Sequence, residues 1–205
     1  HLKRQMPDAI RLDMGISFEG TMTRGTIRSA LRAFSPSARV RRGHVLAPLP
    51  EPLAREFDFG PGACGGRSVA YAMDFGDVSI GWRTTGIADI TSNLRPSKEF
   101  AALATIRSDA DVAALPAGPS AAELRDFPSV LVAEVRNAGG EVCAARLVTP
   151  QIYAITATVA AAIAQRVHEG QFRPGFQTPA ALLGEDFILG FEHCSLTPWP
   201  SAIHA

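Results

Sequence analysis

Three stretches of the chain have a hydrophobic periodicity that predicts a regular element. Residues 10–18 alternate apolar side chains with polar or small ones, and this period of two predicts a half-buried strand. Residues 23–34 space their apolar side chains three and four apart, which predicts a helix that Thr23 caps and Pro36 ends. The same spacing over residues 150–169 predicts the longest helix of the chain.

The remaining segments predict further strands and two short helices. Strands are expected at residues 40–49, as a hairpin turning at 42–43, and at 53–59, 68–73, 86–94, 130–135, 142–147 and 187–189. Helices are expected at residues 98–111 and 121–126. We therefore predict an α+β fold, with a mixed, mostly antiparallel sheet covered by helices on one face. Residues 1–9 are interpreted as a possible linker or cloning remnant, and residues 10–205 as a single domain.

Composition and charge are typical of a soluble globular protein. The 205 residues are 46% hydrophobic, and 20 Lys and Arg balance 20 Asp and Glu, which gives no general attraction to nucleic acid or an anionic membrane. The most apolar run, residues 154–164, is too short to span a membrane. Three cysteines without a CxxC pair favour a cytoplasmic location. The histidines have no metal-ligand spacing, so no metal site is expected.

Positive charge is concentrated in the first fifty residues. They hold nine Lys and Arg against three Asp and Glu, and nine minus three leaves an excess of six. This asymmetry fits an anion-facing surface, and solvated arginines scattered over strand and helix faces explain it at least as well.

Residues 57–66 contain Gly60-x-Gly62-x-x-Gly65, a spacing found in dinucleotide-binding loops. In those loops a helix follows the glycine turn and points its first amides at the pyrophosphate. Here residues 66–73 are predicted to be a second strand, and Pro61 removes one backbone N–H. We therefore interpret the loop as a hairpin connection and expect no cofactor to be bound by this chain.

The segment 76–87 is dense in side chains that bind small molecules, and five of them are candidate substrate-binding residues. They are Asp77, Ser79, Arg83, Thr84 and Thr85. Arg83 has the donor geometry to clamp a carboxylate, with the two threonine hydroxyls beside it. A helix capped by Asp77 with solvated charges is the alternative.

The segment 21–26 is a second candidate, because a helix N-terminus there would offer several donors to an anion. Arg24 and Thr26 are its candidate substrate-binding residues. Ordinary capping of the helix is the simpler explanation.

A series of short motifs occurs in a fixed order from about residue 12 to residue 190. They are Thr23-Arg24-Gly25-Thr26, Val40-Arg41-Arg42-Gly43, Arg55-Glu56-Phe57-Asp58-Phe59-Gly60, Gly76-Asp77-Val78-Ser79, Thr84-Thr85-Gly86-Ile87, Gly175-Phe176-Gln177-Thr178-Pro179-Ala180 and Gly184-x-Asp186-Phe187. Together they resemble the C-terminal portion of the saccharopine-dehydrogenase-like oxidoreductases, a family that includes proteins labelled trans-acting enoyl reductases.

The resemblance implies a two-part protein. In that family an N-terminal Rossmann domain holds NAD(P), and the α+β domain covers the cleft and often helps to form a homodimer. This chain would then be a fragment or a stand-alone relative in which the Rossmann half is absent. It would bind a small-molecule substrate and need a Rossmann partner for hydride chemistry.

One departure from the family concerns the position before the hydroxyl pair. Members often carry histidine there, whereas this chain has Arg83, which stays charged and is no general acid near neutrality. An electrostatic role toward a substrate carboxylate survives this change. The alternative is a non-catalytic binding or assembly module that keeps the fold without the chemistry.

Overall fold

The computed structural model describes residues 1–33, 39–49, 53–62, 64–97, 100, 103–200 and 203–204. The strands are β1 (Arg11–Ser17), β2 (Arg39–Arg42), β3 (Val45–Pro48), β4 (Ala54–Asp58), β5 (Arg67–Ala72), β6 (Asp89–Leu94), β7 (Ser129–Arg136), β8 (Val142–Thr149), β9 (Ser195–Trp199) and β10 (Ile203–His204). The helices are α1 (Leu2–Gln5), α2 (Arg24–Ala33), α3 (Asp77–Thr85), α5 (Asp109–Ala114), α6 (Ala121–Asp126), α7 (Ile152–His168) and α8 (Pro179–Leu183). Two short 3-10 helices are η1 (Leu103–Thr105) and η2 (Phe187–Gly190).

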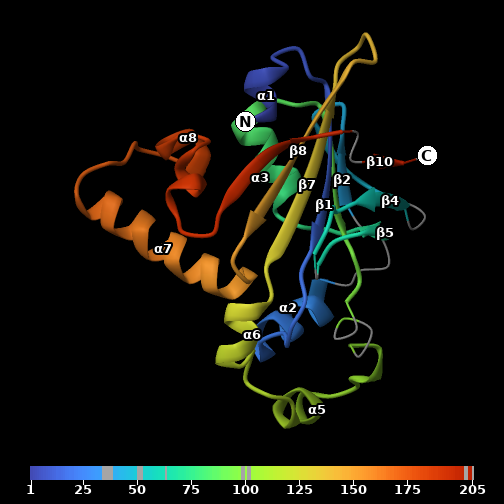
Figure 1. Ribbon diagram of the computed structural model, residues 1–205, viewed down its shortest axis with the longest axis vertical. Coiled ribbons are helices and arrows are strands. Elements are labelled where there is room, and N and C mark those ends of the chain that lie inside the picture. Colours follow the sequence, from blue (N-terminus) through green and yellow to red (C-terminus); the bar gives the residue numbers. More distant parts are fainter. Residues whose placement is uncertain are drawn as a thin grey trace.

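The described strands form one open sheet of ten strands (Figure 1). Its order is β10-β4-β5-β6-β1-β7-β8-β9, and the β2–β3 hairpin joins through β6. β1 pairs parallel with β6, and the other pairs are antiparallel. The predicted α+β class with a mixed, mostly antiparallel sheet is confirmed.

One face of the sheet packs against helices, and we call it the helix-covered face. Leu12 of β1 lies between Ile90 of β6 and Val135 of β7 in register, and all three are buried. Val78 and Ile87, in and after α3, complete this core. Figure 1 shows α1, α3 and α8 on the same side of the strands. The apolar side chains that alternate along residues 10–18 therefore lie under these helices.

Residues 1–9, interpreted from the sequence as a possible linker or cloning remnant, pack into this core. Leu2 and Ala9 are buried there, and Lys3 Nζ donates to the Ala9 carbonyl over 3.0 Å. The segment is therefore part of the folded unit that the structure describes.

The opposite face, which we call the inner face, is partly covered by the sheet itself. Phe57 of β4 lies against Gly15 of β1. Arg146 Nε of β8 donates to the Phe59 carbonyl over 2.7 Å, and Trp199 Nε1 of β9 donates to the Asp58 carbonyl over 3.1 Å. Strands distant in the sheet order thus meet, which shows that the sheet curls over its own inner face.

The β4–β5 connection explains the glycine spacing at residues 60–65. Phe59 N donates to the Gly66 carbonyl and Gly66 N to the Gly60 carbonyl, which closes a tight hairpin. A Cβ on Gly65 would lie 2.0 Å from the Gly60 oxygen, and Gly60 has φ +74° with Trp199 2.7 Å from its would-be Cβ. Strand β5 begins at Arg67 without an intervening helix. The predicted hairpin is confirmed, and close backbone approach is the reason for the glycines.

Two sequence predictions are wrong. Residues 187–189 form the 3-10 helix η2, not a strand: Leu189 N donates to the Asp186 carbonyl over 2.9 Å, and the Phe187 and Phe191 rings meet edge to face at 5.2 Å. The strand of this region is β9. Residues 98–111 are not one helix, since Ser108 forms a capping box that starts α5 separately. Residues 98, 99, 101 and 102, and the predicted helix end at 35–36, lie outside the described part of the chain.

Helix α7 projects away from the sheet (Figure 1). Of its seventeen residues only Ile155 is buried, although most are apolar. Within the described residues, no helix has the length and apolar character needed to cross a membrane. All other residues of α7 are exposed or half-buried.

Candidate functional site

Helix α3 positions all five candidate residues of the segment 76–87. It begins after Gly76, with Asp77 in its first turn, and ends at Gly86, whose φ of +70° closes the helix through a hydrogen bond to the Trp82 carbonyl. An acidic first residue and a left-handed C-terminal glycine both favour this helix. Val78 of α3 is buried against the helix-covered face of the sheet and anchors the helix there, so the candidates lie on a rigid element.

Arg83 is an exposed cation held between two aromatic rings. Its guanidinium lies 5.1 Å from the Trp82 ring centre and 6.0 Å from that of Phe176. Among the described residues it forms no ion pair with a carboxylate. Stacking restricts the side chain while its N–H edge stays available. Arg83 thus meets the geometric requirement for binding an anionic group.

A second arginine lies on the same tryptophan. The Arg41 guanidinium is 4.4 Å from the Trp82 ring centre and donates to the carbonyls of Val78 and His44. Burial, followed by the nearby charge of Arg83, lowers the pKa of Arg41 below its ordinary value. The two guanidiniums make this end of α3 electropositive.

The hydroxyl pair beside Arg83 is already engaged. Thr85 Oγ1 donates its proton to the Gly81 carbonyl over 2.6 Å. Thr84 Oγ1 lies 2.9 Å from the Ile80 carbonyl and 2.8 Å from Thr178 Oγ1, which precedes α8. A hydroxyl carries one proton, so donation to a substrate requires breaking one of these bonds.

Asp77 and Ser79 lie at the other end of α3. Ser92 of β6 donates to Asp77 Oδ2 over 3.2 Å, and burial raises the pKa of Asp77 above its ordinary value. Ser79 is half-buried, with its backbone N–H donating to the Gly76 carbonyl over 2.9 Å. Asp77 therefore faces the sheet, more than a helical turn away from Arg83.

Arg24 and Thr26 lie on α2, at the opposite end of the molecule from α1 (Figure 1). Arg24 donates twice to the Leu115 carbonyl, over 2.8 and 2.5 Å. Thr26 Oγ1 accepts from the Tyr153 hydroxyl over 2.9 Å. These bonds join α2 to the chain before α6 and to α7. The structure does not bring this pair together with the α3 candidates.

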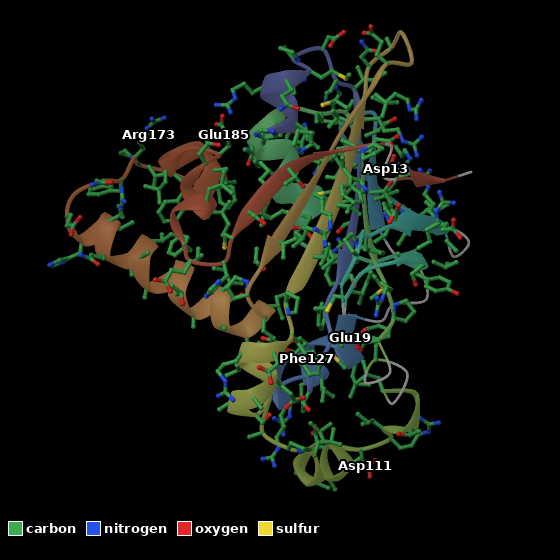
Figure 2. The ribbon with its side chains drawn as sticks, viewed as in Figure 1. Asp13, Glu19, Asp111, Phe127, Arg173 and Glu185 are labelled. Carbon is green, nitrogen blue, oxygen red and sulfur yellow. The ribbon has the colours of Figure 1, made fainter. Side chains whose placement is uncertain are left out.

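A groove of about 240 Å³ runs along the helix-covered face beside α3. Its lining is mainly apolar, from Leu12 and Met14 of β1 to Leu147 of β8, and Thr85 is the one α3 candidate that lines it. Near the groove, Arg4 of α1 forms an ion pair with Glu185 beyond α8, whose position Figure 2 marks.

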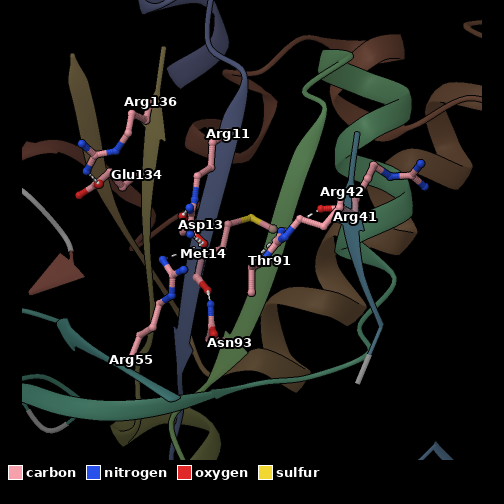
Figure 3. Close-up of polar contacts among 10 residues, drawn as sticks. All are labelled: Arg11, Asp13, Met14, Arg41, Arg42, Arg55, Thr91, Asn93, Glu134 and Arg136. Carbon is pink, nitrogen blue, oxygen red and sulfur yellow. Dashed lines mark hydrogen bonds and ion pairs between the residues drawn. The ribbon is translucent and has the colours of Figure 1, made fainter. Parts of the chain in front are cut away.

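A charged cluster on the inner face was not anticipated from the sequence (Figure 3). Arg11 donates to both oxygens of Asp13, over 2.6 and 3.3 Å, and Arg55 lies 3.3 Å from the same carboxylate. On the neighbouring strand Arg136 donates to Glu134 over 3.0 Å. The sequence signal for this cluster is the pair of charged residues at alternate positions of each strand, Arg11 and Asp13 in β1 and Glu134 and Arg136 in β7. They lie on the face opposite the apolar side chains of these strands.

The described residues contain no group of three or more His, Cys, Asp and Glu side chains placed to hold a metal ion. The three cysteines are free thiols. No protein-family model and no curated protein matches the chain in sequence.

Proposed function

We propose that this chain is the substrate-binding and oligomerisation domain of an NAD(P)-dependent, saccharopine-dehydrogenase-like oxidoreductase. In this proposal a separate Rossmann domain, on the same or another chain, supplies the nicotinamide for hydride transfer to or from a small-molecule substrate. The proposal starts from the ordered motifs that resemble that family.

The observation that carries the proposal is the meeting of two of these motifs far apart in sequence. Thr84 of α3 is 2.8 Å from Thr178, and Arg83 faces Phe176. Thr84 and Thr178 are 94 positions apart in the sequence. Arg83 lies where the two motifs meet, stacks near two aromatic rings, and has no carboxylate partner among the described residues. An arginine in this arrangement is a candidate for binding an anionic group of a substrate.

In this reading Arg83 orients an anionic group of the substrate by a two-point hydrogen-bonded contact. Trp82 and Phe176 restrict its guanidinium. Thr84 and Thr85 hold the helix end and the α8 segment in place, since their protons are engaged. The β4–β5 hairpin offers no helical N-terminus to a pyrophosphate, so the proposal does not place a dinucleotide at this loop.

A non-catalytic binding or assembly module is the second candidate. It is favoured by the same engaged hydroxyls and by arginine at a position where family members often carry histidine. A module of this kind would bind the anionic ligand and show no turnover with any Rossmann partner.

The proposal is tested by fluorescence titration with NADPH and by kinetics. The chain alone should show no saturable NADPH binding, whereas the complete protein with its Rossmann domain should bind it. In the complete protein Arg83→Gln should raise KM at least about tenfold, the equivalent of one charged hydrogen bond. Arg67→Gln, at an exposed arginine of β5, is the matched control. Unchanged KM and turnover in Arg83→Gln would rule out this assignment.

Oligomerisation is assigned to α7, whose Ala161 and Val167 are exposed on an apolar helix. Ala161→Glu keeps helix propensity and adds a charge to this surface. Sedimentation equilibrium should show a self-associating wild type and a weaker-associating variant. A monomeric wild type in the complete protein would remove this part of the proposal.

A further inference from the structure

Four arginines from four strands lie on the inner face, and we call them the arginine cluster. They are Arg11 of β1, Arg42 of β2, Arg55 of β4 and Arg136 of β7 (Figure 3). Only curling of the sheet brings β4 over β1, so the cluster is a product of the tertiary fold.

Three carboxylates face the cluster and leave one positive charge in excess. Asp13 and Glu134 lie directly opposite each other on β1 and β7, and their side chains are only 5% and 4% exposed. Asp89 is in register with Arg11; the hydrogen bond to Asp13 raises the pKa of Arg11 most, and the charge of Asp89 adds to this. Four guanidiniums against three carboxylates give a net charge of +1 at neutral pH.

The excess charge is concentrated on Arg42 and Arg55. Arg42 donates to the Arg41 carbonyl over 2.8 Å and to Thr91 Oγ1 over 3.2 Å, both neutral oxygens. Arg55 shares the single negative charge of Asp13 with Arg11, which donates two hydrogen bonds to that carboxylate.

The electrostatic environment of Arg55 agrees with this account. Burial is the largest influence and lowers its pKa below the ordinary value; Asp13 opposes this, and the charges of Arg11 and Arg42 lower it further. Arg42 and Arg55 also contact neighbouring positions of the sheet, since Thr91, which Arg42 contacts, is in register with Asp13, which Arg55 contacts. The Arg55 side chain is 23% exposed and Arg42 is half-buried, so solvent reaches both.

We propose that Arg42 and Arg55 form a binding site for a small oxyanion, the carboxylate or phosphate group of a ligand that approaches the inner face of the sheet. Two guanidiniums provide more donors than the neighbouring oxygens use, in the forked geometry that oxyanions prefer. This site lies on the opposite face of the sheet from α3 and does not depend on the function proposed for Arg83.

The test is a titration of the whole chain with acetate and with inorganic phosphate at constant ionic strength, monitored by NMR of the arginine Nε–Hε groups. The resonances of Arg42 and Arg55 should shift saturably with at least one probe, and the probe that binds identifies the group. Arg42→Gln and Arg55→Gln should each weaken binding about tenfold or more. Arg67→Gln, outside the cluster, should bind as the wild type does.

Absence of saturable shifts at Arg42 and Arg55 in the wild type would overturn the inference, and so would unchanged affinity in both folded variants. Circular dichroism establishes whether each variant is folded. If one is not, the residue-specific shifts of the wild type decide the outcome alone. Failure here leaves the NADPH and KM tests of the proposed function unaffected.

Discussion

The aromatic ring of Phe57 lies on the backbone of Gly15, close enough that a Cβ built on the glycine would be 2.8 Å from the ring carbon Cδ1. Phe57 is fully buried, and its strand β4 crosses β1 at this point. A side chain at position 15 would hold the two strands apart. The curl of the sheet, and with it the arginine cluster, therefore depends on a missing side chain.

Gly15→Ala should consequently destabilise the protein by about 1–3 kcal/mol, the usual cost of overpacking a core. Urea denaturation measures the change in the free energy of unfolding. The control is Gly25→Ala in α2, where the nearest atom to a new Cβ is 3.9 Å away; its stability should be unchanged or slightly higher, because alanine favours helix. Equal effects of the two substitutions would contradict the packing argument.

Asp13→Asn should be strongly destabilising, because Asp13 is 5% exposed and compensates both Arg11 and Arg55. Removing one partner of a buried ion pair leaves uncompensated charge, and we expect a loss of about 3 kcal/mol, at the lower end of the usual range since both arginines are partly exposed. Thermal or urea unfolding measures the loss.

The control is Glu56→Gln, at an exposed glutamate 3.8 Å from Arg67. Surface pairs of this kind contribute little, so its stability should stay within about 0.5 kcal/mol of the wild type. A similar small effect at Asp13 would show that the inner-face network is solvated and carries no net stabilisation.

The period of two predicted β1 correctly because its apolar half is buried under the helices; β7 and β8 were predicted correctly as a hairpin from the turn residues between them. The strand predicted at residues 187–189 was wrong because a three-residue apolar run does not separate a strand from a helical turn, and here the Phe187 and Phe191 rings meet across a turn. The α3 candidates were found because they are contiguous in sequence. The arginine cluster was not, since its members meet only through the curl and the β2–β6 pairing, which no local pattern encodes.

The carboxylate of Glu123 makes stability depend on pH in the acid range. It accepts hydrogen bonds from Ser120 N, Thr21 N and the Thr21 hydroxyl, over 2.7 to 2.8 Å. These bonds lower its pKa from 4.5 to about 2, the Ser120 amide contributing most. Because the folded pKa is depressed, the stabilisation is complete above pH 4.5 and is lost as the pH falls toward 2.

Glu123→Gln keeps an acceptor oxygen and loses the titrating proton, so its stability should change less than that of the wild type between pH 4.5 and about 2. Thermal midpoints across this range measure the difference. Glu192→Gln, at an exposed glutamate outside the network, should follow the wild-type profile. Parallel profiles for all three proteins would show that Glu123 does not contribute to acid unfolding.

Thr178 connects the two motifs on which the proposed function rests. Its hydroxyl oxygen caps α8 by accepting from Ala181 N over 3.2 Å and lies 2.8 Å from Thr84 Oγ1, and Thr178 is 4% exposed. Thr178→Val keeps the shape of the side chain and removes both bonds. We expect a loss of about 1–2 kcal/mol, the sum of a cap and a buried partner left unsatisfied.

Hydrogen exchange locates this effect. The α8 amides should exchange faster in Thr178→Val while those of β1 and β7 keep their protection, because the substitution removes only the cap of α8 and the hydrogen bond to Thr84 of α3. Thr156→Val is the matched control, since the exposed Thr156 hydroxyl bonds only within α7, to the Ile152 carbonyl. If α8 exchange is unchanged in Thr178→Val, other contacts hold Phe176 against Arg83, and the convergence of the two motifs does not depend on the threonine pair.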